Sequence, residues 1–287
     1  MTFSPIAVDA PFSRPWTLAA PIALASVGLH SGRTIQLSVL PAPAGTGLAF
    51  RRVDLPGAPV IPALANHATQ TYLSTTLVAG EASVQTVEHV LAALWGLGLT
   101  DAWIDLDGPE APGMDGSALP LVEAILEVGV VALPGLRRRH AIQGGVAEGE
   151  RSVSVVPSDR SVVTIACDYG HPDAGARILT FDLTPAVFAR EIAPARTFCL
   201  QHEAEAMRAA GLAKGGSFDN AVVFGPDGPS SALRFPDEPA RHKALDLIGD
   251  LALVGAQWSG HVVAVKAGHG LHVALARQAL APREIPV

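Results

Sequence analysis

The chain has 287 residues, enough for one large domain or two ordinary ones, and 49% of them are hydrophobic against 16% charged. This composition supports a substantial core and excludes a globally disordered protein. The net charge of −7 argues against non-specific nucleic-acid binding. Two cysteines, Cys167 and Cys199, are too few for a disulfide framework and indicate a reducing compartment.

The amino-terminal segment, residues 1–16, lacks a basic start followed by a long apolar block, so it does not resemble a signal peptide. The longest apolar runs carry acidic residues and stop short of membrane-spanning length. We therefore expect a cytoplasmic protein without a transmembrane segment.

The first half begins with strands. Residues 16–50 alternate between apolar and polar side chains, and the clusters PAPAGTG and LPGAPVIP predict turns. Residues 74–85 predict a hairpin that turns near Ala79 and Gly80.

A helix is expected next. Thr86 is a candidate cap, Gly96 and Gly98 are candidate stops, and apolar residues recur with helical spacing at Val90, Leu91, Leu94 and Trp95. A strand over 101–108, a helix over 117–131 and a linker over 134–140 follow.

The second half repeats this order of elements. Strands are expected at 152–158, 161–170, 176–183 and 259–269, and helices at 200–212, 241–250 and 272–280. In both halves a helix with a histidine near its start is followed by a strand and another helix. The pattern predicts an α+β fold of two related domains, residues 1–134 and 135–287.

Two helices carry candidate metal ligands. His242, Asp246 and Asp250 share one face of the helix over 241–250, beside an apolar stripe that suits ordinary packing. Glu88 and His89 stand in the first turn of the first-half helix. His89, His242 and Asp246 would give three nitrogen or oxygen ligands and an open fourth position, as in hydrolytic zinc sites. Glu88 would then be placed to act as a general base on a bound water.

His269 lies in KAGHG, just past an apolar strand where glycines allow close backbone approach. Asp250 stands one helical turn beyond Asp246 and could orient His269 without binding the metal. This pair predicts a general acid.

Seven motifs occur in the order of one known family: SVGLHSGR (26–33), TVEHVLAALWGLGL (86–99), GPEAPGMDGSALP (108–120), ARTFCL (195–200), KGGSFDNAVVF (214–224), LRFPDEPARHKALDLIGDL (233–251) and KAGHG (266–270). Over residues 16–277 the chain resembles the UDP-3-O-acyl-N-acetylglucosamine deacetylases, zinc amidases of lipid A biosynthesis. The resemblance implies a Gram-negative-type bacterial cytoplasm and a small amphipathic UDP-sugar substrate that carries an acyl chain. It also implies two domains, each a small sheet with two helices, with the helices sandwiched between the sheets.

The resemblance assigns roles to single residues. It implies zinc binding by His89, His242 and Asp246, a general base in Glu88, and a general acid in His269 with Asp250 as its electrostatic partner. Thr197 would stabilise the tetrahedral oxyanion as a hydroxyl donor. Substrate contacts are implied for His30, Leu73, Phe198 and Lys243; His30 could equally be a satisfied histidine at a strand end.

The family also has a βαβ insert that forms a tunnel for the acyl chain. The matching region is about 197–225, where Phe198, Leu200, Met207 and Leu212 could line the tunnel, although a buried helix face has the same pattern. The chain departs from the family at Ser74, where a cysteine is usual, and near Gln143, where a basic residue would hold the diphosphate. The run Arg137–Arg139 is a candidate substitute, but such a run is commonly a solvated linker.

Two other functions stay open at this point. One is a zinc amidohydrolase acting on another acylated amino sugar, and the other is a non-catalytic binding module with a structural zinc. The His, His, Asp set also accepts Fe(II). We expect a monomer that binds no nucleic acid.

Overall fold

Two sheets with the same strand order form the outer layers of the fold. The computed structural model describes residues 14–137 and 139–280. Most of the amino-terminal segment 1–16, in which we expect no signal peptide, therefore lies outside the described residues. The sheet of the first half has the order β2-β3-β9-β4-β5, and that of the second has the path β12-β13-β19-β14-β15. In both, one pair is parallel, β4 with β9 and β14 with β19, and the other neighbours along these paths are antiparallel.

The strands of the first sheet are β2 Ile22–Val27, β3 Thr34–Pro41, β4 Leu48–Arg52, β5 Val60–Pro62 and β9 Ala102–Leu106. Those of the second are β11 Arg139–Ala141, β12 Gly144–Glu148, β13 Arg151–Val156, β14 Ser161–Cys167, β15 Arg177–Asp182 and β19 Gln257–Val265, with β11 pairing on β19. A duplicated topology explains why the sequence shows the same order of elements twice.

Smaller sheets complete the strand layers. They comprise β1 Trp16–Leu18 with β10 Val130–Ala132, the antiparallel β6 Ala68–Gln70, β7 Thr76–Ala79 and β8 Ala82–Gln85, and β16 Phe198–Leu200 with β17 Val222–Gly225 and β18 Gly228–Pro229. The predicted hairpin over 74–85 is thus confirmed as β7 and β8. Because β16 and β17 are parallel and flank helix α4 Gln201–Ala209, they form the expected βαβ unit.

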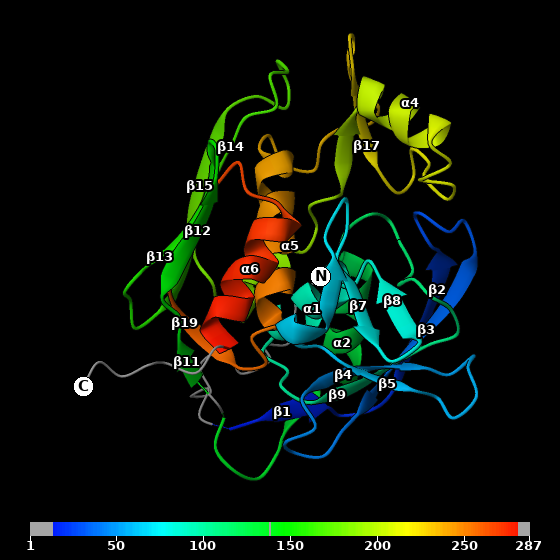
Figure 1. The fold of residues 1–287 in the computed structure, drawn as a ribbon, viewed down its shortest axis with the longest axis vertical. Helices are drawn as coiled ribbons and strands as arrows, with labels where there is room; N and C mark the ends of the chain where they lie inside the picture. The colour runs from blue at the N-terminus through cyan, green and yellow to red at the C-terminus, as the bar shows by residue number, and fades with distance from the viewer. Residues whose placement is uncertain (1–13, 138, 281–287) are drawn as a thin grey trace.

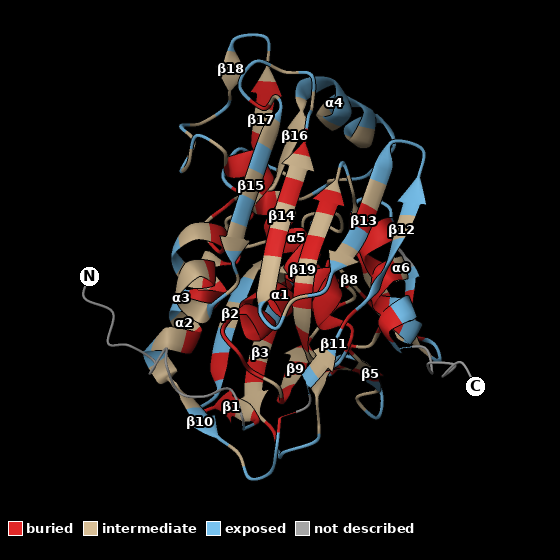
Figure 2. Ribbon diagram, turned by 90° about the vertical axis from the view of Figure 1, so that its left-hand side faces the viewer, coloured by how far each residue is buried: buried red, intermediate tan, exposed pale blue. Residues whose placement is uncertain are grey.

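The longer helices other than α4 lie between the two main sheets, whereas α4 lies apart from them beside β17, as Figure 1 shows. The longer ones are α1 Glu88–Gly96, α2 Leu119–Val128, α5 Glu238–Ala252 and α6 His269–Leu280, and the short ones are η1 Ala65–His67, α3 Pro185–Val187 and η2 Phe188–Ile192. Buried residues run through the helices and the inner faces of the strands (Figure 2) and form one large cluster that spans both halves. Trp95 of α1 stacks on Trp258 of β19 with ring centroids 5.0 Å apart, so the halves share one core.

No helix within residues 14–137 and 139–280 is long and apolar enough to cross a membrane.

The halves meet in sequence between β10 and β11. We propose a domain boundary at residues 134 and 135, because β10 closes the first half on β1 while β11 joins the second sheet. The expected linker over 134–140 is too long: Arg139 and His140 already belong to β11, and Arg137 is buried. Pairing with β19 begins at Arg139, so the exposed connection is limited mainly to Pro134, Gly135 and Leu136.

Helix α1 begins differently from the prediction and ends as predicted. Thr86 is not its capping residue: Val87 takes that position, and the Thr86 hydroxyl lies 3.4 Å from Oε1 of Glu110. With φ of 58°, Thr86 adopts the left-handed conformation that turns the chain from β8 into α1. The helix ends at Gly96, and Gly98 follows with φ of 88°.

A glycine sets how closely α1 and α5 approach each other. A Cβ at Gly249 of α5 would collide with the carbonyl oxygen, carbonyl carbon and Cα of Glu88. The missing side chain therefore lets the first turn of α1, which carries Glu88 and His89, lie directly against α5.

Gly249→Ala should destabilise the protein although alanine is the better helix former. The clash is with backbone, so we expect overpacking to cost about 1–3 kcal/mol, against a gain of roughly 1 kcal/mol in helix propensity. Chemical denaturation measures the difference, and metal binding should weaken in parallel because His89 moves. An unchanged or raised free energy of unfolding would contradict the packing argument.

Candidate metal centre and catalytic cavity

Three predicted ligands converge where α1 crosses α5. His89 comes from α1, and His242 and Asp246 come from successive turns of α5. The Nε2 atoms of His89 and His242 lie 3.6 Å and 3.4 Å from Oδ1 of Asp246. One ligand atom from each residue lies within 4.8 Å of the other two, a spacing that a single divalent cation can bridge.

The surroundings of His242 leave its Nε2 free to bind a cation. Its Nδ1 donates a hydrogen bond to the carbonyl oxygen of Ala195 at 3.0 Å, which fixes the tautomer and directs Nε2 toward Asp246. Burial lowers the pKa of His242 to about 4, so the ring is neutral near pH 7. A neutral, oriented imidazole is the form that ligates metals.

Asp246 is held as a carboxylate. Lys243 donates to its Oδ2 at 2.9 Å, while Oδ1 faces the two imidazoles. Burial opposes the charge, but Lys243 and His242 hold the pKa of Asp246 well below its usual value. The residue therefore presents a charged oxygen to the cation position.

Glu88 lies beside this cluster and has a different environment. Its Oε2 accepts the backbone N–H of Thr75 at 3.0 Å, and the residue is buried. Burial raises the pKa of Glu88 above its usual value. A carboxylate with a raised proton affinity suits a group that takes a proton from water.

On the other side of Glu88, His269 pairs with Asp250. Nδ1 of His269 donates to Oδ2 of Asp250 at 2.8 Å, and Thr75 donates its hydroxyl to Oδ1 at 2.6 Å. Burial disfavours a charged ring, but Asp250 outweighs it and raises the pKa of His269 to about 10. His269 is therefore a cation at neutral pH and can donate a proton.

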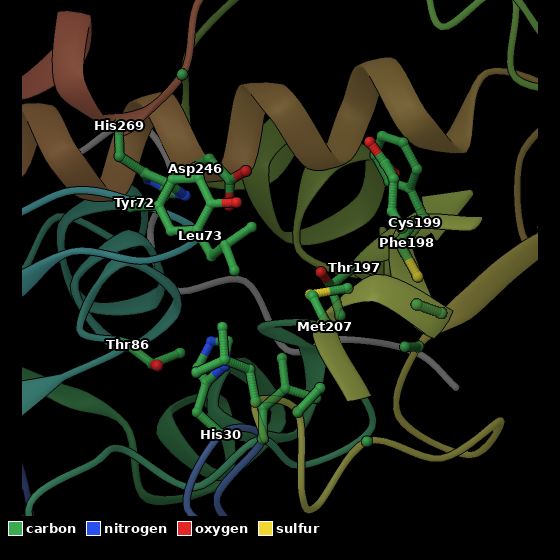
Figure 3. Close-up of a pocket in the computed structure, with 18 of the residues that line it drawn as sticks. His30, Tyr72, Leu73, Thr86, Thr197, Phe198, Cys199, Met207, Asp246 and His269 are labelled. Atoms are coloured by element: carbon green, nitrogen blue, oxygen red, sulfur yellow. The ribbon is translucent and has the colours of Figure 1, made fainter. Parts of the chain in front are cut away.

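These groups open into a cavity of about 760 Å³. Figure 3 shows Asp246 and His269 on one side, Thr197 and Phe198 facing them from the insert, and His30 from the first half. Most of the predicted site residues line it: His30, Leu73, Glu88, His89, Thr197, Phe198, Met207, Leu212, His242, Lys243, Asp246 and His269. Asp250 lies behind His269. Leu200 instead packs against the small cluster of Ala174, Val222 and Phe224, of which the last two belong to β17 of the insert.

Comparison with known proteins fits this geometry. The family model of UDP-3-O-acyl N-acetylglycosamine deacetylases matches residues 16–281. The chain belongs to this family. A relative named UDP-3-O-acyl-N-acetylglucosamine deacetylase from Nostoc sp. is 45% identical over 280 residues, which cover 92% of this chain and 98% of the relative. Relatives of the same name from Anaeromyxobacter dehalogenans and Thermosynechococcus vestitus are 44% and 45% identical, covering 92% and 91% of this chain and 87% and 92% of theirs.

Ser74, Gln143 and Arg137, where we expect departures from the family, are not among the described residues that line the cavity. Ser74 is buried and accepts a hydrogen bond from the Gln85 amide at 3.0 Å. Gln143 is exposed just before β12, and Arg137 lines a separate cavity of about 270 Å³, while Arg139 is exposed; a role of the arginine run in holding the diphosphate stays a prediction. Arg138 lies outside the described residues.

Several cavity residues escape sequence reasoning. Arg151 and Glu148 reach the cavity from the β12–β13 hairpin, and Tyr169 follows β14. None of the three stands in one of the sequence motifs. Their place in the cavity depends on how the second sheet packs near the insert, which the sequence alone does not indicate. His272 was missed as well: its Nδ1 lies 2.9 Å from Oδ2 of Asp250. Its spacing of three residues from His269 on a helix was the available signal.

Asp246→Ala should abolish tight binding of one divalent cation. It removes the charged ligand, so the loss should exceed the roughly 10- to 100-fold cost of losing a supporting contact. Metal analysis of the purified protein, together with titration of a chelated sample, measures the change. Asp182→Ala, at an exposed aspartate that pairs with Arg160, is the matched control and should keep its metal. Full metal content in the Asp246 variant would exclude this centre.

Proposed function

We propose that the protein is a zinc-dependent deacetylase that hydrolyses the N-acetyl group of UDP-3-O-[(3R)-3-hydroxyacyl]-N-acetylglucosamine. The products are the free amine and acetate, and the reaction is the committed step of lipid A biosynthesis in the cytoplasm. Family membership supports this function, and one observation carries it: a cation-sized donor set, the buried carboxylate of Glu88 and the imidazole of His269 line one cavity.

The donor set fits zinc, and Fe(II) fits it as well. His89, His242 and Asp246 would hold the ion. Once bound, it would act as a Lewis acid on the amide carbonyl and lower the pKa of a water.

The protein's own groups divide the proton transfers. Glu88 takes the proton from the attacking water, and Thr197 donates its hydroxyl to the oxygen that becomes negative. Thr197 is held by backbone bonds, since its N–H reaches the Gly116 carbonyl at 2.7 Å and its carbonyl accepts from Val222 at 2.9 Å. His269 then protonates the departing amine, which is a poor leaving group until it gains a proton.

The insert provides a place for the acyl chain. Phe198, Met207 and Leu212 line the cavity from the insert, and the Phe198 ring centroid lies 6.1 Å from that of the predicted ligand His242. Nζ of Lys243, which donates to Asp246, lies 5.6 Å from the centroid of the Phe198 ring. The insert therefore lies close to the metal-ligand cluster. We therefore place the amide at the metal ligands and the acyl chain against α4.

A substrate comparison tests the function. Acetate release from the long-chain UDP-sugar should stop after chelation and return with added zinc. Each buried methylene contributes about 0.8 kcal/mol, so shortening the acyl chain by two carbons should lower kcat/KM roughly tenfold or more. A hydrolase of another amino sugar would be insensitive to that truncation, and a binding module would release no acetate at all. Either result would refute the proposed substrate.

Glu88→Gln should lower kcat by about 10²- to 10⁴-fold, because the amide keeps the shape and loses the basic oxygen. Metal content and the unfolding transition should stay close to the wild type. Glu123→Gln, on the exposed side of α2, is the control for removing one carboxylate and should remain fully active. Near-normal turnover in the Glu88 variant would mean that another group is the base.

A further inference from the structure

Asp250 contacts two imidazoles, those of His269 and His272. The proposed acid step requires only the contact with His269, so the contact with His272 needs its own explanation. Nδ1 of His269 lies 2.8 Å from Oδ2 of Asp250, and Nδ1 of His272 lies 2.9 Å from the same oxygen. Both histidines belong to α6 and stand three residues apart, so both face α5. The Thr75 hydroxyl occupies the other oxygen at 2.6 Å.

His272 cannot touch the substrate. Among the described residues that line the cavity, His269 is present and His272 is not. Only 1% of the surface of His272 is exposed, and none of that of Asp250. Whatever His272 contributes to the reaction must therefore pass through Asp250.

The shared oxygen also determines the state of each ring. An ionised carboxylate only accepts hydrogen bonds, so each Nδ1 carries a proton. A second positive charge beside His269 would be repelled in this dry setting, and burial lowers the pKa of His272. His272 is thus a neutral donor, while the charged groups facing His269 are Glu88 on α1 and Asp246 and Asp250 on α5.

We propose that His272 is a positioning residue for the acid step: through Asp250 it holds the His269 ring in the orientation that delivers its proton. Three donors, from Thr75, His269 and His272, fix the plane of the carboxylate. A neutral donor on Oδ2 also shares the negative charge that stabilises the His269 cation, which makes the Nε2–H of His269 more acidic and eases transfer of that proton to the amine. The inference rests on the proposed deacetylation.

The test compares two substitutions. His272→Phe keeps an aromatic ring and removes the donor, and we expect kcat to fall roughly 10- to 100-fold, as is typical for the loss of an outer partner, while KM and metal content stay unchanged. His272→Asn restores an N–H near the position of Nδ1 and should recover most of the activity. Val273→Ala, at the next buried position of α6, controls for lost packing and should keep kcat.

A second measurement does not depend on turnover. In protein with ¹⁵N-labelled histidine, the Nδ1 proton resonance of His269 should shift in His272→Phe and return in His272→Asn. If His272→Phe fails to fold, Thr75→Val removes a donor from the other oxygen of Asp250 and should lower kcat in the same way.

Three results would overturn the proposal: unchanged kcat and resonance in His272→Phe, no recovery in His272→Asn, or an equal loss of kcat in Val273→Ala. If the wild-type protein releases no acetate, the proposed function fails, and the resonance shift still decides whether His272 acts on His269.

Discussion

The close crossing of α1 and α5 is the constraint on which the site depends. Each half supplies an incomplete set: Glu88 and His89 from one, His242 and Asp246 from the other. Gly249 allows the two helices to approach until these groups share one cation position. The common core, with Trp95 of one half stacked on Trp258 of the other, packs the two halves together around this crossing. A metal centre can therefore be precise although its ligands are far apart in sequence.

Three buried carboxyl groups near this crossing have pKa values shifted in different directions, because each has different partners. Asp246 has Lys243 and Asp250 has His269, and these partners lower the pKa values of both acids despite burial. Glu88 accepts a backbone N–H and is dominated by burial, which raises its pKa. Environments that separate the proton affinities of neighbouring acids also separate their roles. Here the difference agrees with the roles proposed for Asp246 as ligand, Asp250 as orienting partner and Glu88 as base.

Sequence reasoning found most of the helices and main strands, because hydrophobic periodicity is local and both halves repeat it. It also grouped His89 with His242 and Asp246, since helical spacing links His242 with Asp246 and His89 stands in the first turn of the corresponding helix of the first half. It failed where tertiary contacts decide. Thr86 has the side chain of a cap but lies in a left-handed turn. Leu200 is apolar, as a residue of the acyl tunnel should be, yet its side chain packs against Val222 and Phe224 of the neighbouring strand β17.

The part of the cavity in which we propose that the acyl chain binds also depends on contacts between the two halves, as the candidate metal site does. The loop after α4 docks on the turn between β2 and β3, where Gly215 donates to the Leu29 carbonyl at 3.0 Å and Lys214 to that of His30 at 3.4 Å. A Cβ at Gly215 would collide with the carbonyl of Gly28, so this contact, like the helix crossing, requires a glycine. The turn between β2 and β3 of the first half therefore packs against the insert of the second half. In the function proposed above, binding of the acyl chain and hydrolysis of the amide both depend on glycine contacts between the two halves, and a change that separates the halves would disable both.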